Sequence, residues 1–213
     1  IGRCEIERRA DAPKPLTPEE SAKRFRLPED LQVELVAAEP LVQDPTAIAF
    51  DPQGRMFVCE LHGFNLGLHL EVQKLNKSGV LDRGLRRPTI SPEVEKEAEE
   101  QTYGTIKLLV DENGDGRMDR ADVWADRLPP CLGLVPARGG FIVVSPVEIF
   151  FLADIDQDGR AEIRETLFRG FGRTMLERSI NSPCWGLDNW IYVAGGVATG
   201  HVTGPNLSAP VRI

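Results

Sequence analysis

The feature that most constrains the fold is an acidic segment that occurs twice, 43 residues apart. Residues 108–119 read LLVDENGDGRMD and residues 151–162 read FLADIDQDGRAE, so each copy places an acidic loop after a short apolar run. A repeat of this length is the size of one four-stranded propeller blade. The repeat therefore predicts that the two copies occupy equivalent places in successive blades.

A second set of segments alternates with the acidic copies. Residues 48–58, 132–143 and 183–193 each read as strand, turn and strand. The order along the chain is hairpin, acidic hairpin, hairpin, acidic hairpin, hairpin. This order predicts an all-β fold, a partial β-propeller of about two and a half four-stranded blades. A propeller needs at least four blades to close its ring, so we expect a fragment of a longer domain. A sandwich with two similar loops is the alternative.

Short runs rich in β-branched and aromatic residues predict the individual strands. These runs are 33–37, 47–50, 55–61, 105–110, 121–125, 141–145, 148–153, 163–168 and 190–194. Residues 1–30 are predicted to be a lead-in with a short helix to about Phe25, because Thr17-Pro18-Glu19-Glu20 is a capping box with proline at the first helical position. Residues 31–213 are predicted to be the incomplete propeller, with an insertion at 62–103 that contains a helix from Ser91 to about Gln101.

Both acidic loops match the pattern D-x-[DN]-x-D-G-x-x-[DE]. Oxygen atoms at positions 1, 3, 5 and 9 and the backbone carbonyl at position 7 can converge on one ion, and glycine at position 6 permits the turn. Ca²⁺ suits this set better than Mg²⁺, because Ca²⁺ accepts six to eight oxygens in flexible geometry. The candidate ligands are Asp111, Asn113, Asp115, Arg117 and Asp119 in the first loop, Asp154, Asp156, Asp158, Arg160 and Glu162 in the second, and Asp122 and Glu165 at position 12.

The residues on either side of the loops are β-formers and not helix-formers, which favours a calcium-binding hairpin over an EF-hand and makes position 12 an optional ligand. An ion at such a hairpin tip is expected to be structural, because it offsets the repulsion between the carboxylates. A solvated acidic turn without an ion is the alternative for each loop.

Charge and cysteine spacing exclude several classes of protein. The 213 residues carry a formal net charge of −8, which argues against a nucleic-acid partner. No apolar stretch is long enough for a membrane span. The first residue is Ile1, so we expect a processed, trimmed or partial chain. The four cysteines, Cys4, Cys59, Cys131 and Cys184, form neither CxxC nor CxxCH. One disulfide and buried free thiols both remain open.

Three parts of the chain carry a family resemblance: residues 17–21 with 33–40, the two acidic repeats, and residues 185–192, which read WGLDNWIY. In these parts the chain resembles the N-terminal half of the "membrane-bound dehydrogenase" propeller domain of exported bacterial proteins, a relative of the soluble quinoprotein glucose and sorbosone dehydrogenases. The resemblance covers roughly residues 17–62 and 104–196. It implies a six- or seven-bladed propeller, export to the periplasm or cell surface, and often a cytochrome c domain further along the protein.

The activity that the resemblance implies is oxidation of a sugar or alcohol, with pyrroloquinoline quinone as electron acceptor. The relatives carry a histidine base where this chain has Arg178, three residues before Asn181, and an aspartate where it has Gly195-Gly196. Arginine stays protonated and cannot accept the proton of a substrate hydroxyl. Two functions therefore remain open: a quinone-dependent dehydrogenase, and a non-catalytic calcium-binding propeller that binds carbohydrate or a protein partner and serves as a scaffold.

A few further residues are weak candidates for a site. Glu60, Arg178 and Asn181 are the catalytic candidates, and Arg173 and Arg178 are candidates for binding an anionic ligand or cofactor. Glu60 and Asn65 could reach a central channel, although a plain carboxylate at a strand end explains Glu60 as well. His62, His69 and His201 are expected at the surface. Trp185 and Trp190 are expected to pack between blades.

Overall fold

The chain divides into two compact units, and each contains residues whose structure is described. The computed structural model describes residues 15–62, 92–93, 103–172, 178–196 and 199–213. Residues 1–38 and 65–100 belong to the first unit, and residues 39–64 and 101–213 to the second.

In the first unit, the helix α1 (Pro18–Ala22) begins at the predicted capping box. The Thr17 hydroxyl accepts a hydrogen bond from the Glu20 backbone N–H at 3.2 Å, and the Glu20 carboxylate accepts one from the Thr17 backbone N–H at 3.0 Å. The helix ends at Ala22, with Lys23 as the C-cap, which is earlier than predicted. Pro92 and Glu93 are helical, and the rest of the predicted insertion helix lies outside the described residues. Among the described residues, no helix has the length and apolar character needed to cross a membrane.

The prediction of a strand at residues 33–37 is wrong. These residues have no regular secondary structure, and Val33 and Val36 are exposed. A strand needs a neighbouring strand to satisfy its backbone hydrogen bonds, and none of the strands among the described residues pairs with this segment.

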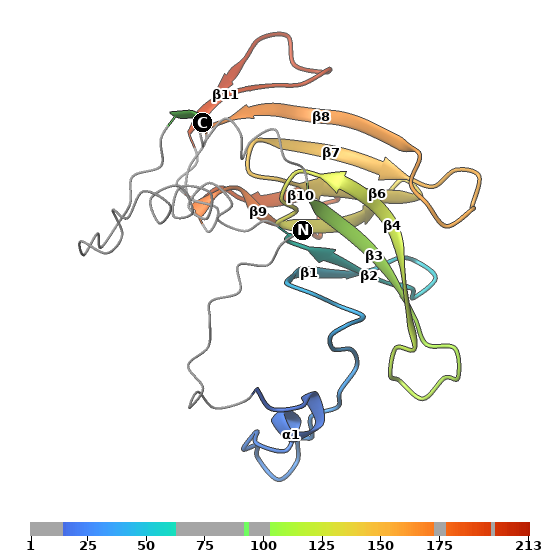
Figure 1. Cartoon of the computed structure of the whole chain (residues 1–213). Coiled ribbons are helices and arrows are strands. Elements are labelled where there is room, and N and C mark those ends of the chain that lie inside the picture. Colours follow the sequence, from blue (N-terminus) through green and yellow to red (C-terminus); the bar gives the residue numbers. More distant parts are fainter. Residues whose placement is uncertain (1–14, 63–91, 94–102, 173–177, 197–198) are drawn as a thin grey trace. The chain divides into compact units, whose positions relative to one another are not determined.

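The first sheet of the second unit is a four-stranded antiparallel meander (Figure 1). Its strands β1 (Pro45–Phe50), β2 (Met56–Glu60), β3 (Gly104–Val110) and β4 (Arg120–Leu128) are neighbours in the order of the sequence. Glu60 lies opposite Thr105 in the β2–β3 pair. The segment predicted as an insertion, 62–103, therefore connects two adjacent strands.

A second meander follows directly, and a separate hairpin comes after it. The strands β5 (Gly133–Ala137), β6 (Gly140–Val144), β7 (Glu148–Ala153) and β8 (Ile163–Phe171) pair in sequence order. Two further strands, β11 (Gly200–Thr203) and β12 (Val211–Arg212), extend this sheet beyond β8, while β9 (Asn181–Trp185) and β10 (Ile191–Ala194) form the hairpin. Strand β5 contacts both β1 and β9. The first strands of the two meanders and of the hairpin therefore lie side by side.

The all-β class and the alternation of plain and acidic hairpins are confirmed. Strands β5 and β9 are predicted only as parts of the strand–turn–strand segments 132–143 and 183–193, and they contain Pro136 and Pro183. Both strands end their sheets, and an edge strand tolerates a proline because one side of its backbone needs no partner. The sequence pattern does not predict β11 and β12, which begin after a Gly-rich stretch.

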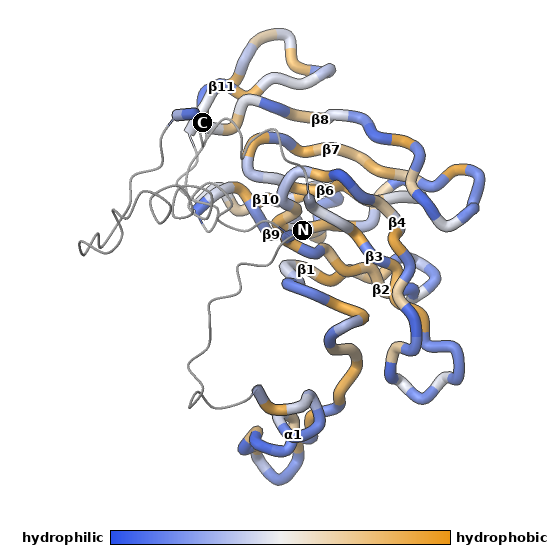
Figure 2. Tube along the Cα trace, viewed as in Figure 1, coloured by the Kyte–Doolittle hydropathy of each residue, from blue (hydrophilic) through white to orange (hydrophobic). Residues whose placement is uncertain are grey.

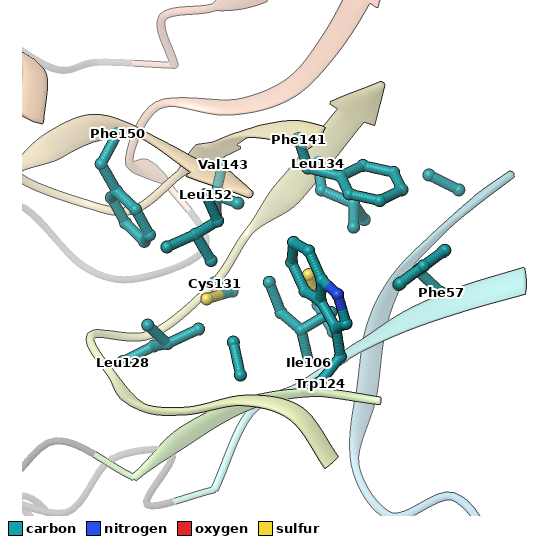
Figure 3. Close-up of a cluster of buried hydrophobic side chains, with 13 residues drawn as sticks. Phe57, Ile106, Trp124, Leu128, Cys131, Leu134, Phe141, Val143, Phe150 and Leu152 are labelled. Carbon is teal, nitrogen blue, oxygen red and sulfur yellow. The ribbon is translucent and has the colours of Figure 1, made fainter. Parts of the chain in front are cut away.

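Aromatic side chains join the two meanders in one core. Phe57 of β2 lies 4.5 Å from Phe141 of β6 and 5.3 Å from Trp124 of β4 between ring centroids, and Trp124 lies 5.5 Å from Phe141. The three residues are buried, and Figure 3 shows them with their neighbours in the core. Along the chain, apolar strand segments alternate with hydrophilic turns, and the tips of both acidic loops are hydrophilic (Figure 2).

Candidate metal centre

The second acidic loop, residues 154–162, connects β7 to β8. Ile163 follows it directly in a strand, so the loop is flanked by strands on both sides, as predicted. Two residues of the loop have a left-handed backbone conformation: Gln157, with φ of 61°, and Gly159, with φ of 93°. Gly159 is suited to this conformation because it has no Cβ atom. The two bends turn the side chains of the loop toward one another.

Three acidic side chains of this loop converge. Asp154, Asp156 and Glu162 each offer one oxygen atom, and these atoms lie within 4.8 Å of one another. Two oxygens on opposite sides of a Ca²⁺ ion are about 4.6–5.2 Å apart, because Ca–O distances are about 2.3–2.6 Å. The spacing therefore fits a shared Ca²⁺ ion.

One oxygen of Asp154 supports the same interpretation. The Asp154 Oδ2 atom accepts a hydrogen bond from the Gly159 backbone N–H at 3.0 Å. The Oδ1 atom is buried and has no hydrogen-bond partner among the described residues. A buried carboxylate oxygen without a partner is costly, and a bound cation would satisfy it.

The second loop is also held in place by β4 of the other meander. The Ala161 backbone N–H donates to the Trp124 carbonyl oxygen at 2.8 Å. The Arg160 guanidinium lies 3.6 Å from the Asp126 carboxylate, and both side chains are largely exposed. The backbone bond fixes the position of the loop, whereas the exposed ion pair adds little.

The first acidic loop, residues 111–119, has the same local design in a more exposed place. Its left-handed residues are Gly114 and Gly116, at positions 4 and 6. Asp111 accepts hydrogen bonds from the backbone N–H groups of both glycines, at 2.7 and 2.8 Å. Donation by Gly116, then by Gly114 and the neighbouring N–H groups, lowers the pKa of Asp111. The carboxylate is thereby kept ionised.

The other predicted ligands of the first loop are bonded mainly within it. The Asn113 side-chain oxygen accepts from the Asp115 N–H, the Asp115 carboxylate accepts from the Arg117 N–H, and Asp119 accepts from the Glu112 N–H. Asp158 of the second loop likewise accepts from the Arg160 N–H at 2.8 Å. Within the described part of the chain, three converging acidic side chains occur in the second loop alone.

The position-12 candidates lie outside both loops. Asp122 is a strand residue of β4, opposite Leu108, and its carboxylate pairs with Arg120. Glu165 is a strand residue of β8, opposite Phe151. Strand pairing therefore keeps these two side chains away from the loop interiors.

A pocket of about 840 Å³ lies beside the second loop. It is lined by the β1–β2 turn with Asp51 and Arg55, the β5–β6 turn with Arg138, the loop residues Asp154 and Gln157, and Trp185 of β9. Phe57, Trp124 and Phe141 lie next to the pocket, although all three side chains are buried. Three turns that are far apart in the sequence form this pocket, so local sequence patterns could not have predicted it.

The side chains of the pocket are held by specific contacts. Asp51 accepts from the Arg55 guanidinium at 2.6 Å and from the backbone N–H groups of Gln53 and Arg55. The Trp185 indole N–H donates to the Pro136 carbonyl oxygen at 2.8 Å, which fixes the ring although 48% of the residue is exposed. The Arg138 guanidinium lies 5.3 Å from the Phe151 ring centroid. The pocket thus combines one fixed, exposed indole with hydrogen-bonding groups.

Comparison with known families gives one match. The sequence profile described as domain of unknown function, DUF7133, matches residues 17–211. The chain belongs to the DUF7133 family. The search of curated proteins and the search of solved structures each gave no match.

In this DUF7133 domain, the catalytic candidate Glu60 is fully buried at the end of β2. Its Oε1 atom accepts from the Gln43 N–H at 2.7 Å and pairs with the Lys107 ammonium at 2.9 Å, and its Oε2 atom contacts His62 Nε2 at 2.8 Å. The Lys107 ammonium also donates to the Leu41 carbonyl oxygen at 3.0 Å. These contacts tie residues 41–43 to the sheet, which is a structural role.

The remaining candidates of the DUF7133 domain are dispersed. Arg178 is exposed just before β9, and Asn181 begins β9 and donates from its side chain to the Ser179 carbonyl oxygen. Arg173, Asn65 and His69 lie outside the described residues. His201 is exposed in β11, as expected, whereas His62 is only partly exposed because it contacts Glu60.

Neither of the two tryptophans predicted to pack between blades is buried. Trp185 of β9 is 48% exposed, and its indole N–H donates a hydrogen bond to the Pro136 carbonyl oxygen of β5. This bond links the hairpin to the second meander. Trp190 is 71% exposed, so the prediction that it packs between blades is wrong for the described structure. It lies in the turn that precedes β10.

Proposed function

We propose that this DUF7133 domain is a calcium-stabilised module of the β-propeller type, and that the ion binds at the second acidic loop. The observation that carries the proposal is the convergence of Asp154, Asp156 and Glu162, and the unpartnered Asp154 Oδ1 atom supports it. The loop offers only hard oxygen donors, which is the ligand set that Ca²⁺ prefers.

The strand arrangement supports the propeller part of the proposal. Each meander has four antiparallel strands in sequence order. Strand β5, the first strand of the second meander, contacts β1 of the first meander and β9 of the hairpin. Successive blades of a propeller are related in this way around a central axis. Two meanders and a hairpin do not close a ring, so we propose that further blades complete it.

The proposed role of the ion is structural. Without a cation, repulsion between three carboxylates would fray the β7–β8 tip. With a cation, the tip would be fixed and would present Ala161 to the Trp124 carbonyl oxygen, which links the two meanders. Binding energy would thereby become folding energy.

Calorimetric titration with CaCl₂ tests this function. The wild-type chain, freed of metal with a chelator, should bind Ca²⁺ and unfold at a higher temperature in its presence. The substitution Asp156→Asn should weaken Ca²⁺ binding by about tenfold or more, because it removes a charged ligand. Asp126→Asn is the matched control, since Asp126 lies nearby on β4 and outside the acidic cluster. Absence of binding heat, or equal affinities of the two variants, would contradict the proposal.

A second function is carbohydrate binding, and the pocket favours it. The pocket volume lies in the range of small-molecule sites. A fixed indole offers a flat apolar surface for the C–H face of a sugar ring, while Gln157 and Arg138 offer hydrogen bonds to hydroxyl groups. We propose that the domain acts as a binding scaffold through this pocket.

Tryptophan fluorescence during titration with a panel of mono- and disaccharides tests sugar binding. Saturable quenching is expected in the wild-type chain and in Trp190→Phe, and it should be lost in Trp185→Ala. Trp190 is a suitable control because it is exposed on the same hairpin and does not line the pocket. Because Trp124 also lines the pocket, the affinity is compared as well: an affinity in Trp185→Ala equal to that of the wild-type chain would contradict the role of this indole.

Quinone-dependent oxidation of a sugar or alcohol remains a competing proposal that rests on the family resemblance alone. The same resemblance supports export and a cytochrome c domain as electron acceptor. Reconstitution with pyrroloquinoline quinone and Ca²⁺, followed by dye reduction across a sugar panel, tests it. Dye reduction that depends on the quinone would favour the dehydrogenase over the scaffold.

A further inference from the structure

Two buried cysteines belong to the same part of the core, where the two meanders meet. Cys59 belongs to β2, and Cys131 belongs to the connection between β4 and β5. Both residues are fully buried in the same hydrophobic cluster. The two thiols are near enough for Cys131 to raise the pKa of the Cys59 thiol. Figure 3 shows Cys131 inside this cluster, among Leu128, Ile106 and Trp124.

The backbones of the two cysteines are also close. The Thr46 hydroxyl oxygen lies 2.7 Å from the Cys131 carbonyl oxygen and 3.4 Å from the Cys59 carbonyl oxygen. One side chain of β1 therefore bridges the two cysteine backbones. A disulfide requires such proximity, because cysteines whose Cα atoms are more than about 7 Å apart cannot be joined without backbone movement.

A metal site does not explain this pair. Zinc sites use three or four cysteine, histidine or carboxylate ligands. Among the described residues, no group of three or more such side chains includes Cys59 or Cys131. The Cys131 thiol instead donates to the Pro129 carbonyl oxygen at 3.3 Å. Two thiols in an apolar core suit a covalent link better than an ion.

We propose that Cys59 and Cys131 form a disulfide when the chain folds in an oxidising compartment. The oxidant is a small or protein-borne disulfide. One cysteine thiolate attacks this disulfide, one of its sulfurs leaves as a thiolate, and a mixed disulfide forms. The second cysteine then displaces the other sulfur. The two protons of the cysteines pass to the two released thiolates, so the oxidant is reduced to two thiols.

The bond would cross-link the two meanders. It joins β2 of the first sheet to the segment that leads into β5 of the second, and it closes a loop that contains the whole segment 62–103. Cross-linking such a long loop restricts the unfolded chain more than a short one does. The proposal does not depend on calcium binding, since neither cysteine belongs to an acidic loop.

The disulfide can form readily only before the core has closed. The neighbouring Cys131 and burial raise the pKa of the Cys59 thiol, so little thiolate exists in the folded core. Full burial also keeps an oxidant away from both sulfurs. The bond therefore forms during folding, before the core closes, and folded reduced chains oxidise slowly.

Peptide mapping of the refolded chain tests the proposal. The reduced, unfolded chain is refolded in a mixture of reduced and oxidised glutathione, free thiols are alkylated in denaturant, and the peptides are identified by mass spectrometry. We expect one linked pair of peptides that contain Cys59 and Cys131, with Cys184 alkylated, because Cys184 is exposed and outside the cluster. Refolded chains with this link should melt at a higher temperature than the same chains after reduction.

Variants separate the alternatives. Cys184→Ala should form the same link as the wild-type chain, whereas Cys59→Ala and Cys131→Ala should not form it. Alkylation of both Cys59 and Cys131 in wild-type chains that have regained their circular dichroism spectrum would overturn the proposal. A link from either residue to Cys4 or Cys184 would also overturn it. Mapping of the wild-type chain decides the question even where a core variant fails to fold.

Discussion

At the scale of single residues, Asp188 and Tyr192 show how one contact can stabilise a turn over a defined pH range. The Tyr192 hydroxyl donates to the Asp188 carboxylate at 2.7 Å, and the Trp190 backbone N–H donates to it at 3.2 Å. These donors, with Tyr192 first, lower the pKa of Asp188. The same contact raises the pKa of Tyr192.

The two directions define the window in which the contact stabilises the β9–β10 hairpin. The pKa of Asp188 is lower in the folded chain, so its contribution is present above the unfolded value of about 3.9 and is lost as the pH falls through the folded value. The pKa of Tyr192 is higher in the folded chain, so its contribution is complete below the unfolded value of about 10 and is lost as the pH rises through the folded value.

The substitution Tyr192→Phe should raise the pKa of Asp188 toward its usual value. The hydroxyl donor is lost, while the Trp190 N–H remains, so the return should be partial. Carboxyl-carbon NMR titration of both proteins measures the change. The pKa of Asp111 is the internal control, since its donors are backbone N–H groups of another loop. An unchanged Asp188 titration would show that the Tyr192 hydrogen bond is not formed in solution.

At the scale of elements, sequence predicts what lies within a few neighbouring residues. The predicted ligands of each acidic loop fall within nine consecutive residues, so one motif predicts both the hairpin tip and its donors. The capping box of α1 is equally local. By contrast, residues 33–37 have strand composition but pair with no strand in the described part of the chain, and composition cannot reveal this. The pocket depends on three turns that meet only after folding.

The helix α1 allows a prediction at this scale. Thr17→Ala removes the acceptor of the Glu20 N–H and should destabilise the helix by about 1 kcal/mol. Thr17→Ser is the matched control, because serine keeps the hydroxyl and caps equally well. Amide hydrogen exchange of Glu20 should accelerate in the alanine variant only. Equal exchange in the three proteins would mean that the cap is not formed in solution.

At the scale of the whole second unit, stability should depend on the aromatic core that both meanders share. Phe57 is 1% exposed between Trp124 and Phe141, whereas Phe50 of β1, on the same sheet, is 54% exposed. Phe57→Ala should lower the free energy of unfolding by about 3–5 kcal/mol. Phe50→Ala should cost about 1 kcal/mol or less, because little apolar surface is uncovered.

Denaturant unfolding of both variants measures these free energies, with fluorescence and circular dichroism as probes. If the meanders share one core, the two probes should give one transition in Phe57→Ala, at a lower denaturant concentration. Equal costs for Phe57→Ala and Phe50→Ala, or a transition split between the probes, would argue against a shared core.

The central claim is that the second acidic loop binds Ca²⁺ between β7 and β8. A crystal structure of the chain grown with CaCl₂ tests it most directly. The claim predicts one strong density peak about 2.3–2.6 Å from oxygen atoms of Asp154, Asp156 and Glu162, with the Asp154 Oδ1 atom among the ligands. A well-ordered loop without such a peak, in which water satisfies the Asp154 Oδ1 atom, would contradict it.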